Sequence, residues 1–176
     1  MIKFLIAAAA LTMFVTAGEV SARNDGAEHA SAVLVGTTGT QVGWARFTED
    51  ANGIVHVNVH VKGLIPGEHG IHIHAVGACA PTFLAAGGHH NPLGAQHGLE
   101  NPLGPHAGDL PELVVNRAGV GHLDDVTHHA TLSPGPTSVF DADGSALIIH
   151  ADPDDHHTDP TGNSGARIAC GVIEAD

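Results

Sequence analysis

One stretch decides both the fold and the chemistry of this chain: Gly67-Glu68-His69-Gly70-Ile71-His72-Ile73-His74. His72 and His74 alternate with Ile71 and Ile73, which is the two-residue period of a β-strand, so both imidazoles leave on one face. At a rise of about 3.3 Å per residue, next neighbours on that face lie roughly 6.5–7 Å apart. A metal ion with bonds of roughly 2 Å to nitrogen fits between two such rings. The stretch therefore predicts a strand that carries two metal ligands.

Short β-rich runs separated by turn residues surround this strand. The runs at 32–37 and 41–48 predict a hairpin, and the run at 54–62 follows the turn signal Asn52-Gly53. Its valines take one face, which leaves His56 and His60 on the solvent side. Further strands are predicted at 113–115, 120–126, 146–150 and 168–173. No run beyond residue 22 sustains a 3.6-residue period, so the fold is predicted to be all-β, a sandwich or barrel.

Two long segments, 77–111 and 151–165, show no strand pattern and are predicted to be loops. A loop of this length inside a compact domain requires a function or is disordered. The first loop carries histidines at 89, 90, 97 and 106, which indicates that a metal orders it. The chain has 16 His against 6 Lys plus Arg, and they occur at distinct spacings rather than in one tract.

Residues 1–22 have the pattern of a secretory signal. A short basic start precedes an apolar run that is too short to span a bilayer, and Val20-Ser21-Ala22 offers small residues for cleavage after Ala22. A membrane anchor is the less favoured interpretation. We therefore divide the chain into a signal peptide, 1–22, and one domain, 23–176, that is periplasmic or secreted and has no membrane anchor after cleavage.

Charge and cysteine content narrow the function further. The net charge is −13, and loss of Lys3 and Glu19 with the signal leaves it unchanged. This charge excludes a broad electrostatic grip on nucleic acid or on an anionic membrane. The two cysteines, Cys79 and Cys170, are predicted to form a disulfide rather than a metal site, because the protein is exported.

The spacing of the remaining donors predicts two metal sites. His89 and His150 are available as partners for His72 and His74. An imidazole-rich site with an open position suits copper, which the general order of affinities also favours. The second set suits a closed tetrahedral zinc site, with three nitrogens and one oxygen. It consists of His89, His97, His106 and Asp109.

From roughly residue 32 to residue 173 the chain resembles the copper,zinc superoxide dismutases. The resemblance is carried by four motifs in order. The first is the stretch from Gly67 to His74 quoted above. The others are Gly87-Gly88-His89-His90-Asn91-Pro92, His106-Ala107-Gly108-Asp109-Leu110, and Gly162-Asn163-Ser164-Gly165-Ala166-Arg167-Ile168-Ala169-Cys170-Gly171-Val172-Ile173. It implies an eight-stranded Greek-key flattened barrel with two long functional loops, and an enzyme that converts superoxide to oxygen and hydrogen peroxide by Cu(II)/Cu(I) cycling.

The resemblance also assigns residues. The implied copper ligands are His72, His74, His89 and His150. The implied zinc ligands are His89, His97, His106 and Asp109. His89 would thus bridge both metals, and Arg167 would draw in superoxide. A Cys79–Cys170 disulfide would pin the metal loop to the strand of Arg167, and Asp154 would link His74 to His97.

Two other functions compete with this one. A copper-delivery or metal-binding module could keep the scaffold, but all four copper positions and Arg167 are filled here. A zinc hydrolase would need an open zinc position beside a general base, which the four-donor set does not leave. The loop 151–165 contains no lysine, so attraction of an anion must come from Arg167 and the copper site. The oligomeric state stays open, a homodimer included.

Overall fold

The computed structural model describes residues 28–176, so the predicted signal and its cleavage site lie outside the described residues. Ten strands and one short 3₁₀ helix make up this part of the chain. In order they are β1 (Glu28–Gly36), β2 (Gln41–Glu49), β3 (Val55–Lys62), β4 (Gly67–His69), β5 (Ile71–His74), η1 (Phe83–Ala86), β6 (Leu113–Val115), β7 (Val120–Thr127), β8 (Ala146–His150), β9 (Arg167–Val172) and β10 (Glu174–Ala175). The first strand starts at Glu28, earlier than the predicted run.

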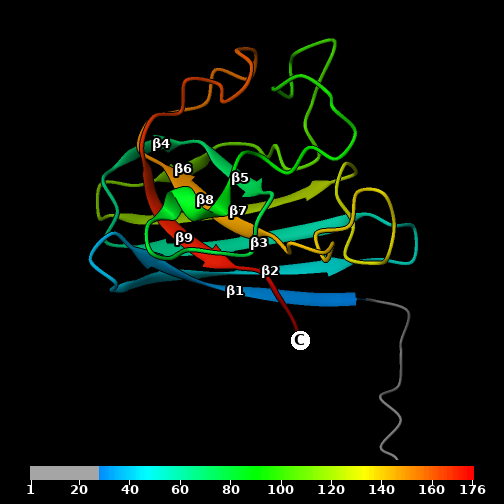
Figure 1. Cartoon of the computed structure of the whole chain (residues 1–176). Coiled ribbons are helices and arrows are strands. Elements are labelled where there is room, and N and C mark those ends of the chain that lie inside the picture. The colour runs from blue at the N-terminus through cyan, green and yellow to red at the C-terminus, as the bar shows by residue number, and fades with distance from the viewer. Residues whose placement is uncertain (1–27) are drawn as a thin grey trace, which may run out of the picture.

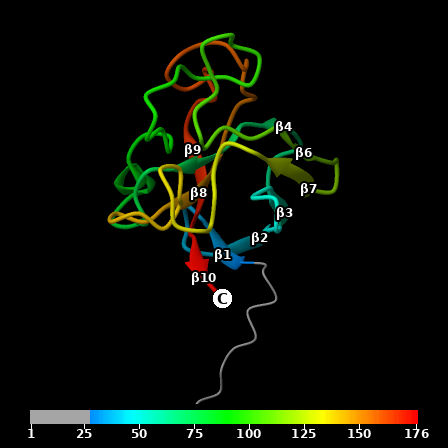
Figure 2. The same cartoon turned by 90° about the vertical axis from the view of Figure 1, so that its right-hand side faces the viewer.

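All pairings between these strands are antiparallel, and they close a barrel (Figures 1 and 2). The order is β4-β6-β7-β3-β2-β1-β9-β8-β5, and its two end strands are consecutive in the chain with only Gly70 between them. Counted with β4 and β5 as one strand, and β10 as the continuation of β9, the barrel has the eight strands expected. The prediction of the fold is confirmed.

The interruption at Gly70 has a local cause. Its N–H donates to Asp152 O at 3.0 Å, and its C=O accepts the N–H of His150 at 2.8 Å. A Cβ atom at this position would lie 2.8 Å from Ser164 Cβ, so glycine lets the loop after β8 approach closely. Gly70 thus joins the motif strand to the second long loop.

The strand interiors fill the barrel with apolar side chains. In β3 the valines are buried and alternate with His56, Asn58, His60 and Lys62, as predicted. The core continues through residues such as Phe47, Ile73 and Leu147, which are all at most 1% exposed. Within residues 28–176 no helix is both long and apolar enough to span a bilayer.

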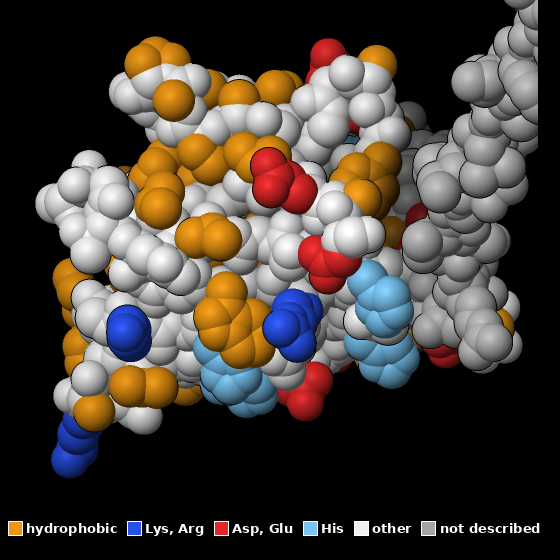
Figure 3. Space-filling view, turned by 90° about the horizontal axis from the view of Figure 1, so that it is seen from below, with side chains coloured by type: hydrophobic (Ala, Val, Ile, Leu, Met, Phe, Trp, Pro, Cys, Tyr) orange, Lys and Arg blue, Asp and Glu red, His pale blue; other side chains and the backbone are white. Residues whose placement is uncertain are grey.

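The outer surface of the sheet carries its own histidines. The His60 ring lies between those of Trp44 and His122, at centroid distances of 4.5 Å and 4.2 Å and tilted against both. Seen from below, this surface shows histidine, hydrophobic and cationic side chains side by side (Figure 3). In the described part of the chain, neither His56 nor His60 belongs to a group of three or more potential metal donors. They are not candidate ligands.

The two long loops rise together from one side of the barrel, at the top of Figures 1 and 2. One connects β5 to β6 and contains η1, and the other connects β8 to β9. β5 and β8 are antiparallel neighbours, so the two loops leave from opposite ends of adjacent strands. The first loop returns to β5, where Asp109 is bridged to His72 and His89 to His74.

Candidate metal centre

Three of the candidate ligands stand on two paired strands. His72 and His74 lie on β5, and His150 is the last residue of β8, whose register places Ile149 opposite Ile71. His89 comes from the first long loop and is held by a β-bridge to His74. We call these four residues the strand cluster: His72, His74, His89 and His150. All four are buried, and one donor atom from each lies within 4.8 Å of the others.

Hydrogen bonds from the surroundings fix how two of these rings face. His74 Nδ1 contacts Gly87 O at 3.0 Å, and His150 Nδ1 contacts Gly165 O at 3.2 Å. A carbonyl oxygen only accepts, so each Nδ1 carries the proton and each Nε2 keeps a free lone pair. The two Nε2 atoms lie 3.4 Å apart. The rings therefore present two lone pairs to the same small space.

The other two rings each leave a nitrogen without a partner. His72 Nδ1 and His89 Nε2 are buried and form no hydrogen bond to residues 28–176. Their opposite nitrogens are engaged, since His72 Nε2 contacts Asp154 at 2.6 Å and His89 Nδ1 contacts Asp109 at 3.0 Å. A buried polar atom without a partner is unfavourable unless a ligand satisfies it. The strand cluster thus fits a metal ion that takes nitrogen ligands.

The second group surrounds one carboxylate oxygen. Asp109 Oδ1 lies 3.0 Å, 3.1 Å and 3.4 Å from the Nδ1 atoms of His89, His97 and His106. Its Oδ2 accepts the main-chain N–H groups of Gly98 and His106, both at 2.9 Å. We call His89, His97, His106 and Asp109 the loop cluster, because all four lie between β5 and β6. Three nitrogens and one oxygen that converge in this way fit zinc.

Distance alone does not separate His72 from the loop cluster. One donor atom each from His72, His89, His97 and Asp109 also lie within 4.8 Å of one another. However, His72 Nε2 is taken by Asp154, while His106 Nδ1 lies 3.4 Å from His89 Nδ1 and from Asp109 Oδ1. The hydrogen-bond pattern therefore favours His106 as the fourth member of the loop cluster.

Asp154 joins the two clusters, but through a different ring from the one expected. Its Oδ2 contacts His72 Nε2 at 2.6 Å and its Oδ1 contacts His97 Nε2 at 2.9 Å. The prediction of a link from His74 to His97 is wrong, because Gly87 O already engages the outward nitrogen of His74. The link from strand cluster to loop cluster runs through His72.

The two clusters differ in protonation. Burial lowers the pKa of His72 to about 3, of His74 to about 2 and of His150 to about 4, so these rings are neutral at pH 7. Burial would also lower the pKa of His97, but hydrogen bonds with Asp109 and Asp154 raise it to about 9. Burial opposes ionisation of Asp109, yet hydrogen bonds from His106, His89 and His97 hold its pKa far below the usual range.

Comparisons with known proteins show the family of this chain. Residues 41–173 match the family described as copper/zinc superoxide dismutase (SODC). The chain is 45% identical to copper-zinc superoxide dismutase 2 of Aquifex aeolicus over 147 residues. This aligned region covers 82% of this chain and 85% of the relative. The chain belongs to the copper/zinc superoxide dismutase family. It is an oxidoreductase that disproportionates superoxide, and its family uses copper and zinc.

Other relatives agree with this assignment. The copper-zinc superoxide dismutase of Caulobacter vibrioides is 39% identical over 149 residues, which is 82% of this chain and 85% of the relative. A crystal structure of a SOD-like protein from Bacillus subtilis is similar with a TM-score of 0.73 at 40% identity, over 81% of this chain and 96% of that chain. The dismutase therefore shares both sequence and barrel with its relatives.

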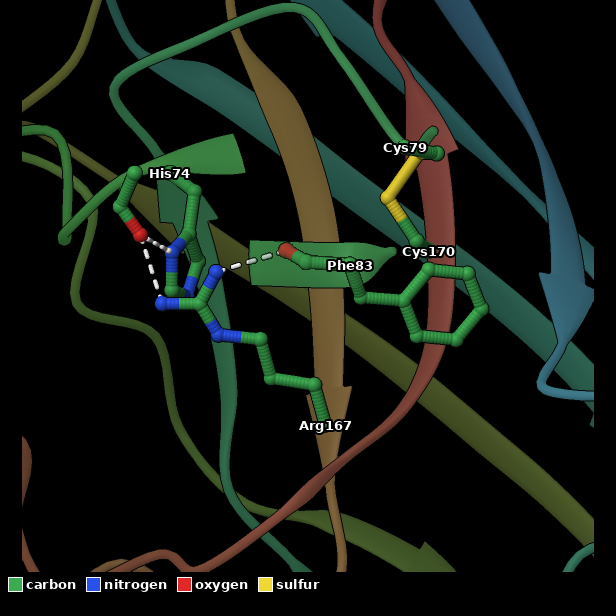
Figure 4. The surroundings of a disulfide bond; sticks show 6 residues. His74, Cys79, Phe83, Arg167 and Cys170 are labelled. Carbon is green, nitrogen blue, oxygen red and sulfur yellow. Dashed lines mark hydrogen bonds between the residues drawn. A yellow bond between two sulfur atoms is a disulfide. The ribbon is translucent and has the colours of Figure 1, made fainter. Parts of the chain in front are cut away.

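Arg167 of the dismutase is held beside the strand cluster by main-chain oxygens (Figure 4). Its two terminal nitrogens donate to Phe83 O at 2.6 Å and Gly87 O at 2.5 Å. The Gly87 oxygen is the one that also contacts His74 Nδ1, so one carbonyl orients the ring and the guanidinium together. No feature of the sequence marks this carbonyl, because every residue carries one.

The disulfide of the dismutase forms as predicted between Cys79 and Cys170. Cys170 lies on β9, three residues after Arg167, and Cys79 precedes η1, whose Phe83 O accepts from Arg167. Figure 4 shows the bond beside this contact. The disulfide thus ties the loop segment that orients Arg167 to the strand that carries it.

A cavity of about 520 Å³ opens onto the strand cluster. Its lining includes His74, His89, His150 and Arg167, together with His106 and the exposed Asp159. The strand cluster is therefore open to a small molecule on one side, which a redox site requires. His97 and Asp109 of the loop cluster are at most 1% exposed and do not line the cavity.

Proposed function

We propose that the strand cluster holds the copper ion of this superoxide dismutase and that the loop cluster holds its zinc ion, with His89 shared between them. The observation that carries the assignment is the pair of buried, unpartnered nitrogens, His72 Nδ1 and His89 Nε2. Bound copper supplies the redox couple that takes an electron from one superoxide and gives it to the next. The net reaction consumes two superoxide ions and two protons and yields one O₂ and one H₂O₂.

The side chains of the chain supply binding and orientation. His74 and His150 keep one nitrogen on a carbonyl oxygen and the other free, so their lone pairs are fixed before a metal arrives. His89 lines the cavity, its Nδ1 is held by Asp109, and its Nε2 is buried without a partner within residues 28–176. This Nε2 would carry either the metal or a proton.

Arg167 provides the positive charge that attracts the superoxide anion. It lines the cavity with His74 and His150, and two main-chain oxygens fix its guanidinium. The chain as a whole carries a net charge of −13, which repels anions. Salt screens the interaction between charges that lie farther apart than a Debye length of about 8–10 Å. The nearby charge of Arg167 therefore outweighs that of distant carboxylates.

The assignment predicts which metal each histidine variant loses, and this pattern tests it. His150→Ala should lower copper affinity and spare zinc, and His106→Ala should do the reverse. His89→Ala should weaken both metals, because its two nitrogens face different clusters. The measurement is the copper and zinc content of each variant after reconstitution and dialysis. Loss of only one metal from His89→Ala would contradict the shared ligand.

We propose further that the mature dismutase works outside the cytoplasm. The pattern of residues 1–22 supports export, and the Cys79–Cys170 bond suits an oxidising compartment. N-terminal sequencing of protein recovered from the periplasm or medium tests this, with Arg23 expected as the first residue. Protein that starts at Met1 and stays with the cytoplasmic fraction would contradict it.

A further inference from the structure

Asp154, which joins the two clusters, is held by a side chain from outside its own loop. The main-chain N–H of Asp154 donates a 2.6 Å hydrogen bond to Glu112 Oε1. Asp154 lies between β8 and β9, in a segment without strand pairing. Glu112 directly precedes β6, which pairs with β4 and β7 in the barrel wall. The hydrogen bond therefore ties the linking residue to the rigid part of the fold.

The geometry at Asp154 leaves little tolerance for movement. Its two oxygens serve His72 at 2.6 Å and His97 at 2.9 Å, and Oδ1 also accepts the N–H of His156 at 2.7 Å. A functional side chain must be held within about 0.5 Å of its productive position. Because one carboxylate contacts a ring in each cluster, displacement of its main chain would disturb both clusters at once.

The surroundings of Glu112 are unfavourable for a carboxylate. The side chain is 17% exposed, and Oε2 is buried without a hydrogen-bond partner within residues 28–176. Its neighbours are Asp154 and His156, whose Nε2 lies 3.6 Å from Oε1. Burial raises the pKa of the Glu112 carboxyl. Burial of a carboxylate costs free energy unless hydrogen bonds offset it, and here only Oε1 accepts one from the described residues.

We propose that Glu112 is a positioning residue of this metal centre, which sets the Asp154 carboxylate through the main-chain N–H of Asp154. The inference rests on the proposed metal assignment, because it predicts that a residue outside both clusters controls how tightly they bind. Through Glu112, the barrel wall would hold in place the Asp154 carboxylate that connects the two clusters.

Two substitutions separate the hydrogen bond from the charge. Glu112→Met keeps the length of the side chain and removes both the charge and the strong acceptor, whereas Glu112→Gln removes only the charge. Loss of a group that orients a ligand weakens metal binding by about 10–100-fold. Glu112 acts one residue further away, so we expect Glu112→Met to lose about three- to tenfold in zinc affinity and Glu112→Gln to stay within about twofold of wild type. Affinity is measured by competition with a chromophoric chelator.

A control and a coupled variant exclude a general structural effect. Glu174→Gln changes an exposed carboxylate on β10 and should leave the affinities unchanged. In an Asp154→Ala background, Glu112→Met should cause no further loss, because the carboxylate that it positions is gone. Faster hydrogen exchange of the Asp154 amide in Glu112→Met, and not in Glu112→Gln, is expected in the zinc-loaded protein.

Three results would overturn the proposal. They are wild-type affinities in Glu112→Met, the same loss in the Asp154→Ala background, and a Glu112→Gln variant as weak as Glu112→Met. Wild-type protein that binds neither metal would overturn the metal assignment as well. Wild-type protein that binds both metals, with Glu112→Met unaffected, would overturn only the role of Glu112.

Discussion

The strand cluster and the loop cluster share His89 but are held together by different forces. In the strand cluster, paired backbones of β5 and β8 place three rings, and burial keeps those rings neutral. In the loop cluster, His89 and Asp109 are bridged to β5, whereas His97 and His106 have no strand pairing and lie around the charge of Asp109. The barrel therefore forms the strand cluster in advance, while the loop cluster depends more on one carboxylate.

The substitution expected to separate the two clusters most strongly is Asp109→Asn. It keeps the size of the side chain but removes the charge that draws His89, His97 and His106 together. We expect zinc affinity to fall by more than about a hundredfold, since outer hydrogen-bond partners alone account for 10–100-fold. Copper affinity, measured by the same chelator competition, should fall by less than about tenfold. Asp124→Asn on the exposed face of β7 is the matched control. Equal losses of both metals would refute the distinction.

Acidity should also act on the two clusters differently. The pKa of His97 is about 9 without metal, so zinc must displace its proton at any lower pH. Zinc affinity should therefore rise about tenfold per pH unit from 6 to 8 and level off above about 9. His72, His74 and His150, with pKa values of about 3, 2 and 4, are already neutral there. Copper affinity corrected for chelator protonation should change by less than about threefold. Parallel slopes for both metals would show that the clusters do not differ in protonation.

Arg167→Ala tests whether the open side of the strand cluster attracts the substrate. Both metals should stay bound, because Arg167 is outside both clusters. The value of kcat/KM should fall about tenfold or more and lose most of its salt dependence, as for a removed steering charge. Arg46→Ala, which removes an exposed cation on β2 near Trp44, should have no effect. An unchanged rate and salt slope in Arg167→Ala would remove local steering from the account.

The smallest expected effect comes from Asp159, a carboxylate at the rim of the same cavity. Its Oδ1 accepts the N–H of His97 at 2.7 Å, a bond that an asparagine oxygen can also accept. Asp159→Asn should raise kcat/KM about two- to threefold at low salt, because it removes a negative charge from the path of an anion. The gain should vanish at high salt. A rate that falls at every salt concentration, with zinc retained, would speak against repulsion at the rim.

The sequence predicted the strand side of the site better than the loop side. The alternation of His72 and His74 with isoleucines requires a common face in any strand, and the structure shows both rings in one cluster. No local period connects His89, His97 and His106 to each other. Their grouping followed from the chemistry of the donors and from a resemblance to a family. Loop geometry depends on contacts that spacing does not encode.

Two details that the sequence did not indicate have the same physical origin. The expected partner of Asp154 was His74, whereas Gly87 O engages that ring and leaves His72 for Asp154. The motif also carries no sign that Gly70 interrupts the strand by bonding to the main chain of the second loop. In both cases a main-chain group decides the outcome. Since every residue carries the same main-chain groups, the sequence does not mark which of them will act.

The most direct test of the central claim is the decay of superoxide followed by stopped flow. Mature protein loaded with copper and zinc is compared with the same protein loaded with zinc alone. We expect a copper-dependent kcat/KM that approaches the diffusional range of about 10⁸–10⁹ M⁻¹s⁻¹, and no measurable rate with zinc alone. A negligible rate with both metals verified in their clusters would contradict it.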